Sequence, residues 1–135
     1  MKRGILSLLA VSIVATGAAW AQVEDPNVGA IYLCNEVALR IRVPAGGLSV
    51  DQRREAVRLR IVRAYATEAV TASNIRLSPQ GNDWVIAVGR TTLLTVTEAD
   101  ARANGTTTAA LAQAWAARLR DLMPRCKPQP LPPGR

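Results

Sequence analysis

The stretch IRLSPQGNDWVIAVGRTTLLTV, residues 75–96, contains three short apolar runs separated by turn-forming residues. Residues 75–77 and 91–96 are only partly apolar, whereas residues 84–88 (WVIAV) are apolar on both faces, as in a central strand. Residues 79–83 (PQGND) are rich in turn formers, and the Gly89-Arg90 pair makes a tight turn. The stretch therefore predicts three strands in an antiparallel meander.

Another strand is predicted upstream of this stretch. Within residues 37–43 (VALRIRV) apolar residues alternate with Arg40 and Arg42, which is the period of a half-buried strand. The residues that follow, PAGG at 44–47, are turn formers that end it.

A long helix should connect this strand to the meander. Ser49 and Gln52 have the spacing of a capping box, which predicts a helix over residues 50–67. Its apolar residues recur on one face. Three arginines lie off that face and are expected to be solvated: Arg53, Arg60 and Arg63.

Two helices are predicted after the meander. Thr97 can cap a short helix over residues 98–103, and we interpret Glu98 and Asp100 as helix N-terminal charges near that cap. A longer helix, capped by Thr106 or Thr107, should end at Pro124. Its apolar face consists of Leu111, Trp115, Leu119 and Leu122.

The predicted order is strand, helix, three-strand antiparallel meander, helix. One apolar sheet face and two amphipathic helices to cover it favour a two-layer α+β sandwich. Residues 31–126 are expected to form this single domain.

The first residues have the features of a secretory signal peptide. Lys2 and Arg3 precede an apolar run, and Ala19-Trp20-Ala21 fits a signal-peptidase site, so we expect residues 1–21 to be removed. The polar residues 22–30 should be a flexible leader, and the proline-rich residues 127–135 a disordered tail. No second long apolar run follows, so we expect no transmembrane segment in the mature chain and a periplasmic or secreted location.

The only two cysteines, Cys34 and Cys126, bracket the predicted domain. In an oxidising compartment they are expected to form a disulfide. A redox-active thiol pair is the alternative, although the close C-x-x-C spacing is missing.

Composition argues against the common enzyme classes. The chain has no His, so Ser-His and Cys-His pairs cannot form, and metal ligands are scarce. We therefore predict no catalytic, cofactor-binding or metal-binding residues. Two of the 17 basic residues lie in the predicted signal peptide, so 15 remain against ten acidic residues, a balance of +5. Nucleic acid is not expected as a partner, because few aromatic residues remain outside the predicted core.

The remaining candidate is a basic surface made of Arg40, Arg42 and Arg76. All three occupy strand positions opposite apolar residues, so neighbouring strands would bring them to one sheet face. Such a face could bind an envelope protein, a second copy of the chain or an anionic ligand.

Residues 93–101 (LLTVTEADA), followed by Leu111, Ala112 and Trp115, and residues 48–57 (LSVDQRREAV) carry a family resemblance. They resemble the extracytoplasmic N-terminal domain that precedes the membrane helices in some bacterial, notably cyanobacterial, relatives of small-conductance mechanosensitive channels. The resemblance implies a stand-alone accessory or sensory domain of the cell envelope. We therefore expect a non-catalytic binding domain, with an anion-binding protein that uses the basic sheet face, or an unrecognised enzyme, as alternatives.

Overall fold

The structure, a computed structural model, describes residue 25 and residues 27–127. The predicted signal peptide (1–21), residues 22–24 and 26 of the predicted leader, and the tail beyond Lys127 lie outside the described residues. The fold class is α+β, as expected. Its elements are β1 (Ala30–Leu33), β2 (Glu36–Arg40), α1 (Val50–Thr67), the 3-10 turn η1 (Ala72–Asn74), β3 (Ile75–Gln80), β4 (Asp83–Val88), β5 (Thr91–Val96), α2 (Glu98–Ala103) and α3 (Thr108–Arg125).

The helices begin where the capping residues place them. The Ser49 side chain accepts a hydrogen bond from the backbone of Gln52, whose own side chain accepts from the Ser49 backbone, so α1 has the predicted capping box. Thr97 caps α2 and Thr107 caps α3 in the same manner, through hydroxyls that accept from the helix N3 amides. At its other end α3 continues one residue past Pro124.

The strands form two separate antiparallel sheets, a β1-β2 hairpin and a β3-β4-β5 meander. Two-residue turns at Gly81-Asn82 and Gly89-Arg90 connect the meander strands, and each turn uses a glycine with positive φ. The predicted short strand at 75–77 extends to Gln80, so Pro79 and Gln80, which were expected in the turn, belong to β3. A proline is tolerated there because β3 is an edge strand.

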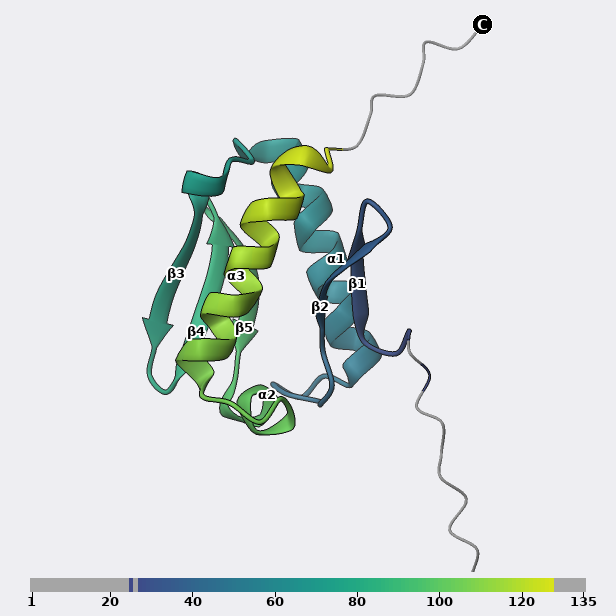
Figure 1. Cartoon of the computed structure of the whole chain (residues 1–135), viewed down its shortest axis with the longest axis vertical. Coiled ribbons are helices and arrows are strands. Elements are labelled where there is room, and N and C mark those ends of the chain that lie inside the picture. The colour runs from purple at the N-terminus through teal and green to yellow at the C-terminus, as the bar shows by residue number, and fades with distance from the viewer. Residues whose placement is uncertain (1–24, 26, 128–135) are drawn as a thin grey trace, which may run out of the picture.

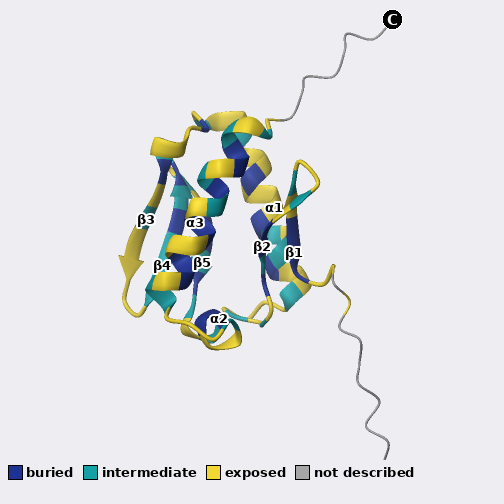
Figure 2. Cartoon of the chain, viewed as in Figure 1, coloured by how far each residue is buried: buried dark blue, intermediate teal, exposed yellow. Residues whose placement is uncertain are grey.

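Helix α3 lies between the two sheets and packs on both of them (Figure 1). All four residues of its predicted apolar face are buried (Figure 2). Helix α1 packs mainly against β5 and, to a lesser extent, β1. One core therefore joins hairpin, helices and meander.

The first strand differs from the prediction. A strand that the sequence analysis missed, β1, begins at Ala30, inside the segment expected to be flexible, and pairs with β2, which ends at Arg40 instead of residue 43. The pairing skips from Val37 to Leu39, so Ala38 is an extra residue in a bulge. Because of this bulge Ala38 and Leu39 are both buried and Val37 is exposed, which breaks the expected alternation.

Candidate functional site

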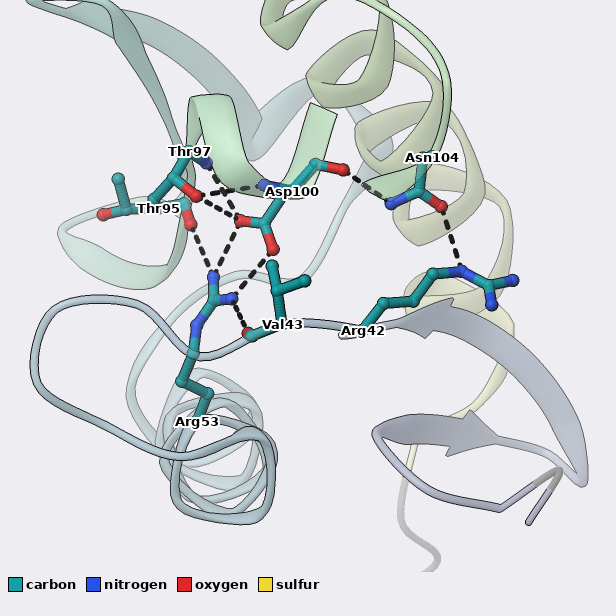
Figure 3. Close-up of polar contacts among 7 residues, drawn as sticks. All are labelled: Arg42, Val43, Arg53, Thr95, Thr97, Asp100 and Asn104. Carbon is teal, nitrogen blue, oxygen red and sulfur yellow. Dashed lines mark hydrogen bonds and ion pairs between the residues drawn. The ribbon is translucent and has the colours of Figure 1, made fainter. Parts of the chain in front are cut away.

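A buried ion pair joins α1 to α2. Arg53 reaches from the first turns of α1, and its Nη1 and Nη2 donate to Oδ1 and Oδ2 of Asp100, each at 2.8 Å (Figure 3). Arg53 is 7% exposed and Asp100 is fully buried. The expectation that Arg53 is solvated was therefore wrong. It lies beside the core because α1 packs its Arg53 side against β5.

The two terminal nitrogens of the guanidinium also bind two further segments. Arg53 Nη1 donates to the Val43 carbonyl at 2.7 Å, and Nη2 donates to the Thr95 carbonyl at 3.3 Å. The Thr95 carbonyl belongs to β5, an edge strand of the meander. Nearby, Arg60 Nη1 donates to the Leu93 carbonyl at 3.4 Å, so two arginines of α1 occupy acceptors along this edge.

Asp100 is held on its other side by the α2 cap. Its Oδ2 accepts from the backbone amide and the hydroxyl of Thr97, both at 3.0 Å. Burial raises the pKa of Asp100, but the hydrogen bonds from Arg53 and Thr97 and the charge of Arg53 outweigh it, so the pKa lies below its ordinary value. The interpretation of Asp100 as a helix-cap residue is confirmed. The sequence did not indicate that Asp100 also forms a buried ion pair with Arg53.

This arrangement suits anchoring better than acid–base chemistry. Both carboxylate oxygens are occupied, and a carboxyl with a lowered pKa is a poor proton donor near neutral pH. The network continues through Arg42, whose Nε donates to Oδ1 of Asn104 at 3.3 Å (Figure 3). The hydrogen bonds thus join four segments: the residues after β2, the first turns of α1, the end of β5, and α2 with its flanking residues.

A surface hollow of about 340 Å³ lies beside the pair, between α1, β5 and the loop around Gly46. Its lining is apolar at Leu48, Val57 and Leu94, and charged at Arg60 and Asp83. Arg60 and Asp83 form no ion pair with any described residue.

The three arginines predicted to share a sheet face are not brought together. Arg40 and Arg42 belong to the hairpin segment, whereas Arg76 lies on β3 in the other sheet. Arg40 donates to the Val28 carbonyl at 3.3 Å, and Arg42 is bound to Asn104. Only Arg76 lies beside Val85 and Ala87 on the open meander face, opposite Ala87 in register. The premise that the first strand neighbours the meander was wrong, because β2 pairs with β1.

The predicted disulfide is present between Cys34 and Cys126, with 5.5 Å between the two Cα atoms. Cys34 and Asn35 form the two-residue turn of the hairpin, and both have positive φ. Next to the disulfide, Glu36 accepts from Arg118 at 2.8 Å and from Arg125 at 2.9 Å. Hydrogen bonds from Arg125 and then Arg118 hold the pKa of Glu36 below its ordinary value. Disulfide and ion cluster together fasten the hairpin to the end of α3.

An exposed apolar surface on α1 was not predicted from the sequence. Leu59 and Val62 are each 54% exposed, and Ala66, one turn further, is exposed as well. We call these three residues the outer stripe of α1. The signal that could have found it was in the sequence: positions 59, 62 and 66 recur at helical spacing on the side opposite Val57, Ile61 and Ala64.

No group of three or more Cys, Asp or Glu residues within residues 25 and 27–127 could hold a metal ion. In the same part of the chain no helix is long and apolar enough to cross a membrane.

Comparison with known proteins gives a family and no characterised relative. No curated protein and no solved structure matches the chain significantly. One family model, described as a domain of unknown function, matches residues 30–125, which are nearly all of the residues that the structure describes. The chain therefore belongs to the DUF8459 family.

Proposed function

We propose that this chain is a non-catalytic protein-interaction domain that acts outside the cytoplasm and binds its partner through the outer stripe of α1. The observation that carries the proposal is the exposure of Leu59 and Val62 on adjacent turns of one helix. A helix that covers a core typically carries polar or charged residues on its opposite face. Leu59 and Val62 are about half buried already, so covering the rest of each would contribute roughly half of the 1.5–3 kcal/mol that full burial of such a side chain gives. The isolated chain does not use this binding energy.

The cysteines and the first residues of the chain support the proposed location. A disulfide that closes a separation of 92 residues persists in oxidising compartments, and residues 1–21 have the features of a secretory signal. Together they favour export to the periplasm or beyond. The resemblance to extracytoplasmic domains of mechanosensitive-channel relatives favours an accessory or sensory role in the cell envelope.

The alternative of an anion-binding protein that uses Arg40, Arg42 and Arg76 has less support, because the three guanidinium groups lie on different sheets. A ligand that contacted all three at once would have to span the hairpin segment and β3. A partner that binds the outer stripe contacts only one helix.

Site-specific photocrosslinking of the full chain in its own cells tests the proposal. A benzophenone side chain placed at Leu59 or Val62 should give a discrete protein adduct. The same side chain at Gln113, an exposed residue of α3, is the matched control and should give none. Absence of an adduct at both stripe positions, or the same adduct at Gln113, would rule out this surface as the interface.

A further inference from the structure

The charges around the outer stripe are strongly one-sided. Helix α1 carries five arginines against two acidic residues, Asp51 and Glu55. Arg58 is bound to Glu55 at 2.7 Å, and Arg54 lies 3.8 Å from Asp51. Arg53 is paired with Asp100 in the interior. The two arginines left without a carboxylate among the described residues are Arg60 and Arg63.

These two arginines lie next to the stripe. Arg60 and Arg63 line a hollow of about 290 Å³ together with Leu59 and Ala56. On the other flank Val62 and Ala66 line a second hollow, of about 480 Å³, near Tyr65. An apolar ridge with a hollow on each flank is a shape that side chains of a second helix can interlock with. Alanines at positions 56 and 66 let such a helix approach closely.

We propose that the outer stripe of α1 binds an acidic amphipathic helix of a partner protein. Apolar residues of that helix at i, i+3 or i+4, and i+7 pack on Leu59, Val62 and Ala66, and its carboxylates bind Arg60 and Arg63. This inference rests on the proposed function and adds the chemistry of the partner.

Other occupants fit the surface less well. A second copy of α1 would bring arginines against arginines, because the helix has more than twice as many basic as acidic residues. A membrane surface would demand more apolar area than two large side chains supply, and membrane-bound helices typically add aromatic residues, which the stripe lacks. Charge complementarity therefore favours an acidic protein helix.

The test uses the purified, disulfide-intact protein and two synthetic helical peptides of about 18 residues. The first peptide has Leu at the apolar positions and Glu around them, and the second has Gln in place of every Glu. Binding is followed by fluorescence anisotropy at about 50 mM and about 500 mM salt. The acidic peptide should bind at low salt, at least about tenfold more tightly than the Gln peptide, and should weaken at high salt.

Variants locate the binding surface. Arg60→Ser with Arg63→Ser should weaken the acidic peptide at least about tenfold, and Leu59→Ser should weaken both peptides. The charge-matched control, Arg76→Ser with Arg90→Ser, removes two exposed arginines elsewhere and should leave binding unchanged. Thermal melts of all variants confirm that the fold is retained.

Several outcomes would overturn the inference: equal binding of the Gln peptide, equal weakening by the control pair, or no binding of either peptide. Binding of phosphatidylglycerol vesicles without binding of the peptide would assign the stripe to a membrane, and a dimer in sedimentation that Leu59→Ser dissolves would assign it to a second copy. If neither peptide binds but photocrosslinks at Leu59 are still formed, the proposed acidic partner helix is ruled out while the outer stripe remains supported as an interaction surface. If neither peptide binds and no photocrosslink forms at the stripe, the proposed function is ruled out as well.

Discussion

Glu98 and Asp100 lie two residues apart in α2, yet one is exposed and the other is fully buried. Residues separated by two point to different sides of a helix, so the spacing alone shows that the two carboxylates differ in environment. Spacing cannot show what lies on each side. The partner of Asp100, Arg53, is 47 positions away, and nothing local in the sequence connects them. The Thr97 cap was predictable because a cap is a local motif.

Asp100→Asn should lower the free energy of unfolding by about 3–5 kcal/mol, because it leaves the Arg53 charge buried without a counter-charge. An interpretation of Asp100 as a helix-end charge alone would limit the loss to about 1 kcal/mol. Urea denaturation measures the difference. Glu98→Gln in the same turn is the control and should change stability by less than about 0.5 kcal/mol. A loss near 1 kcal/mol for Asp100→Asn would show that the buried pair contributes little.

The same carboxyl should make stability depend on acidity. The folded-state pKa of Asp100 lies below its ordinary value of 3.8, so the unfolded chain takes up its proton first as the pH falls. The stabilisation by ionised Asp100 is complete above that ordinary value and is lost as the pH drops through the folded-state pKa. The stability gap between the natural chain and Asp100→Asn should therefore narrow below pH 4 or so. A gap that stays constant from neutral to strongly acidic pH would contradict the lowered pKa.

At the scale of elements, the hairpin is the part that sequence reasoning described least well. Strand β1 has only four residues, and its turn, Cys34-Asn35, lacks the glycine that normally marks a two-residue hairpin turn. The bulge at Ala38 then shifts the apolar pattern of β2 out of phase. The caps of α1, α2 and α3 and the Gly89-Arg90 turn rest on local chemistry and were predicted correctly, whereas the first meander turn is shorter than the predicted 79–83.

The disulfide should hold this hairpin. Cys34→Ser with Cys126→Ser should lower stability by up to about 4–5 kcal/mol, the chain-entropy effect of opening a loop of 92 residues. Replacing Cys34 by Gly in the same background should recover several tenths to about 1 kcal/mol, because position 34 has a φ of 50° that glycine adopts without strain. Chemical denaturation of the three proteins measures both effects. Free thiols in the denatured, unreduced natural chain would disprove the bond itself.

Helix α3 carries the largest side chain of the shared core. Trp115 is 7% exposed and lies on the buried face with Leu111 and Leu119. Trp115→Ala should therefore cost about 3–5 kcal/mol, the usual range for truncating a large aromatic side chain in a core. Gln113→Ala on the exposed side of the same helix is the control and should be nearly neutral. Equal melting of Trp115→Ala and the natural chain would contradict the buried face.

At the scale of the whole molecule, the α+β class and the order of the main elements from β2 onward could be predicted because hydrophobic period and turn residues are local properties. The arrangement of the sheets could not. The prediction placed the first strand beside the meander, but β2 pairs with the unforeseen β1, and α3 separates the resulting hairpin from the meander (Figure 1). The expected arginine surface needed the first strand to lie beside β3, and it does not. Arg42 therefore lies away from Arg76 and donates a hydrogen bond to Asn104.

This architecture makes a prediction about cooperativity. An isolated two-stranded hairpin is marginally stable in water, so β1 and β2 depend on their contacts with α1 and α3. The disulfide links the hairpin turn covalently to the end of α3. The hairpin therefore cannot separate from the core unless the end of α3 moves with it. In the oxidised protein, the paired amides of the hairpin should therefore exchange hydrogen with nearly the same free energy as those of β4, in a single global unfolding event.

Native-state hydrogen exchange measures these free energies residue by residue. In the Cys34→Ser, Cys126→Ser protein the hairpin amides should exchange through a separate opening, at a free energy below that of the Ile86 amide in β4. The α3 core contacts with β3 and β4 survive that opening, so tryptophan fluorescence from Trp84 and Trp115 should still report the later, global transition. A hairpin that already opens well before β4 in the oxidised protein would show that the two sheets are independent folding units joined only by a covalent bond. Since α3 contacts β2, β3 and β4 alike, we expect the opposite result.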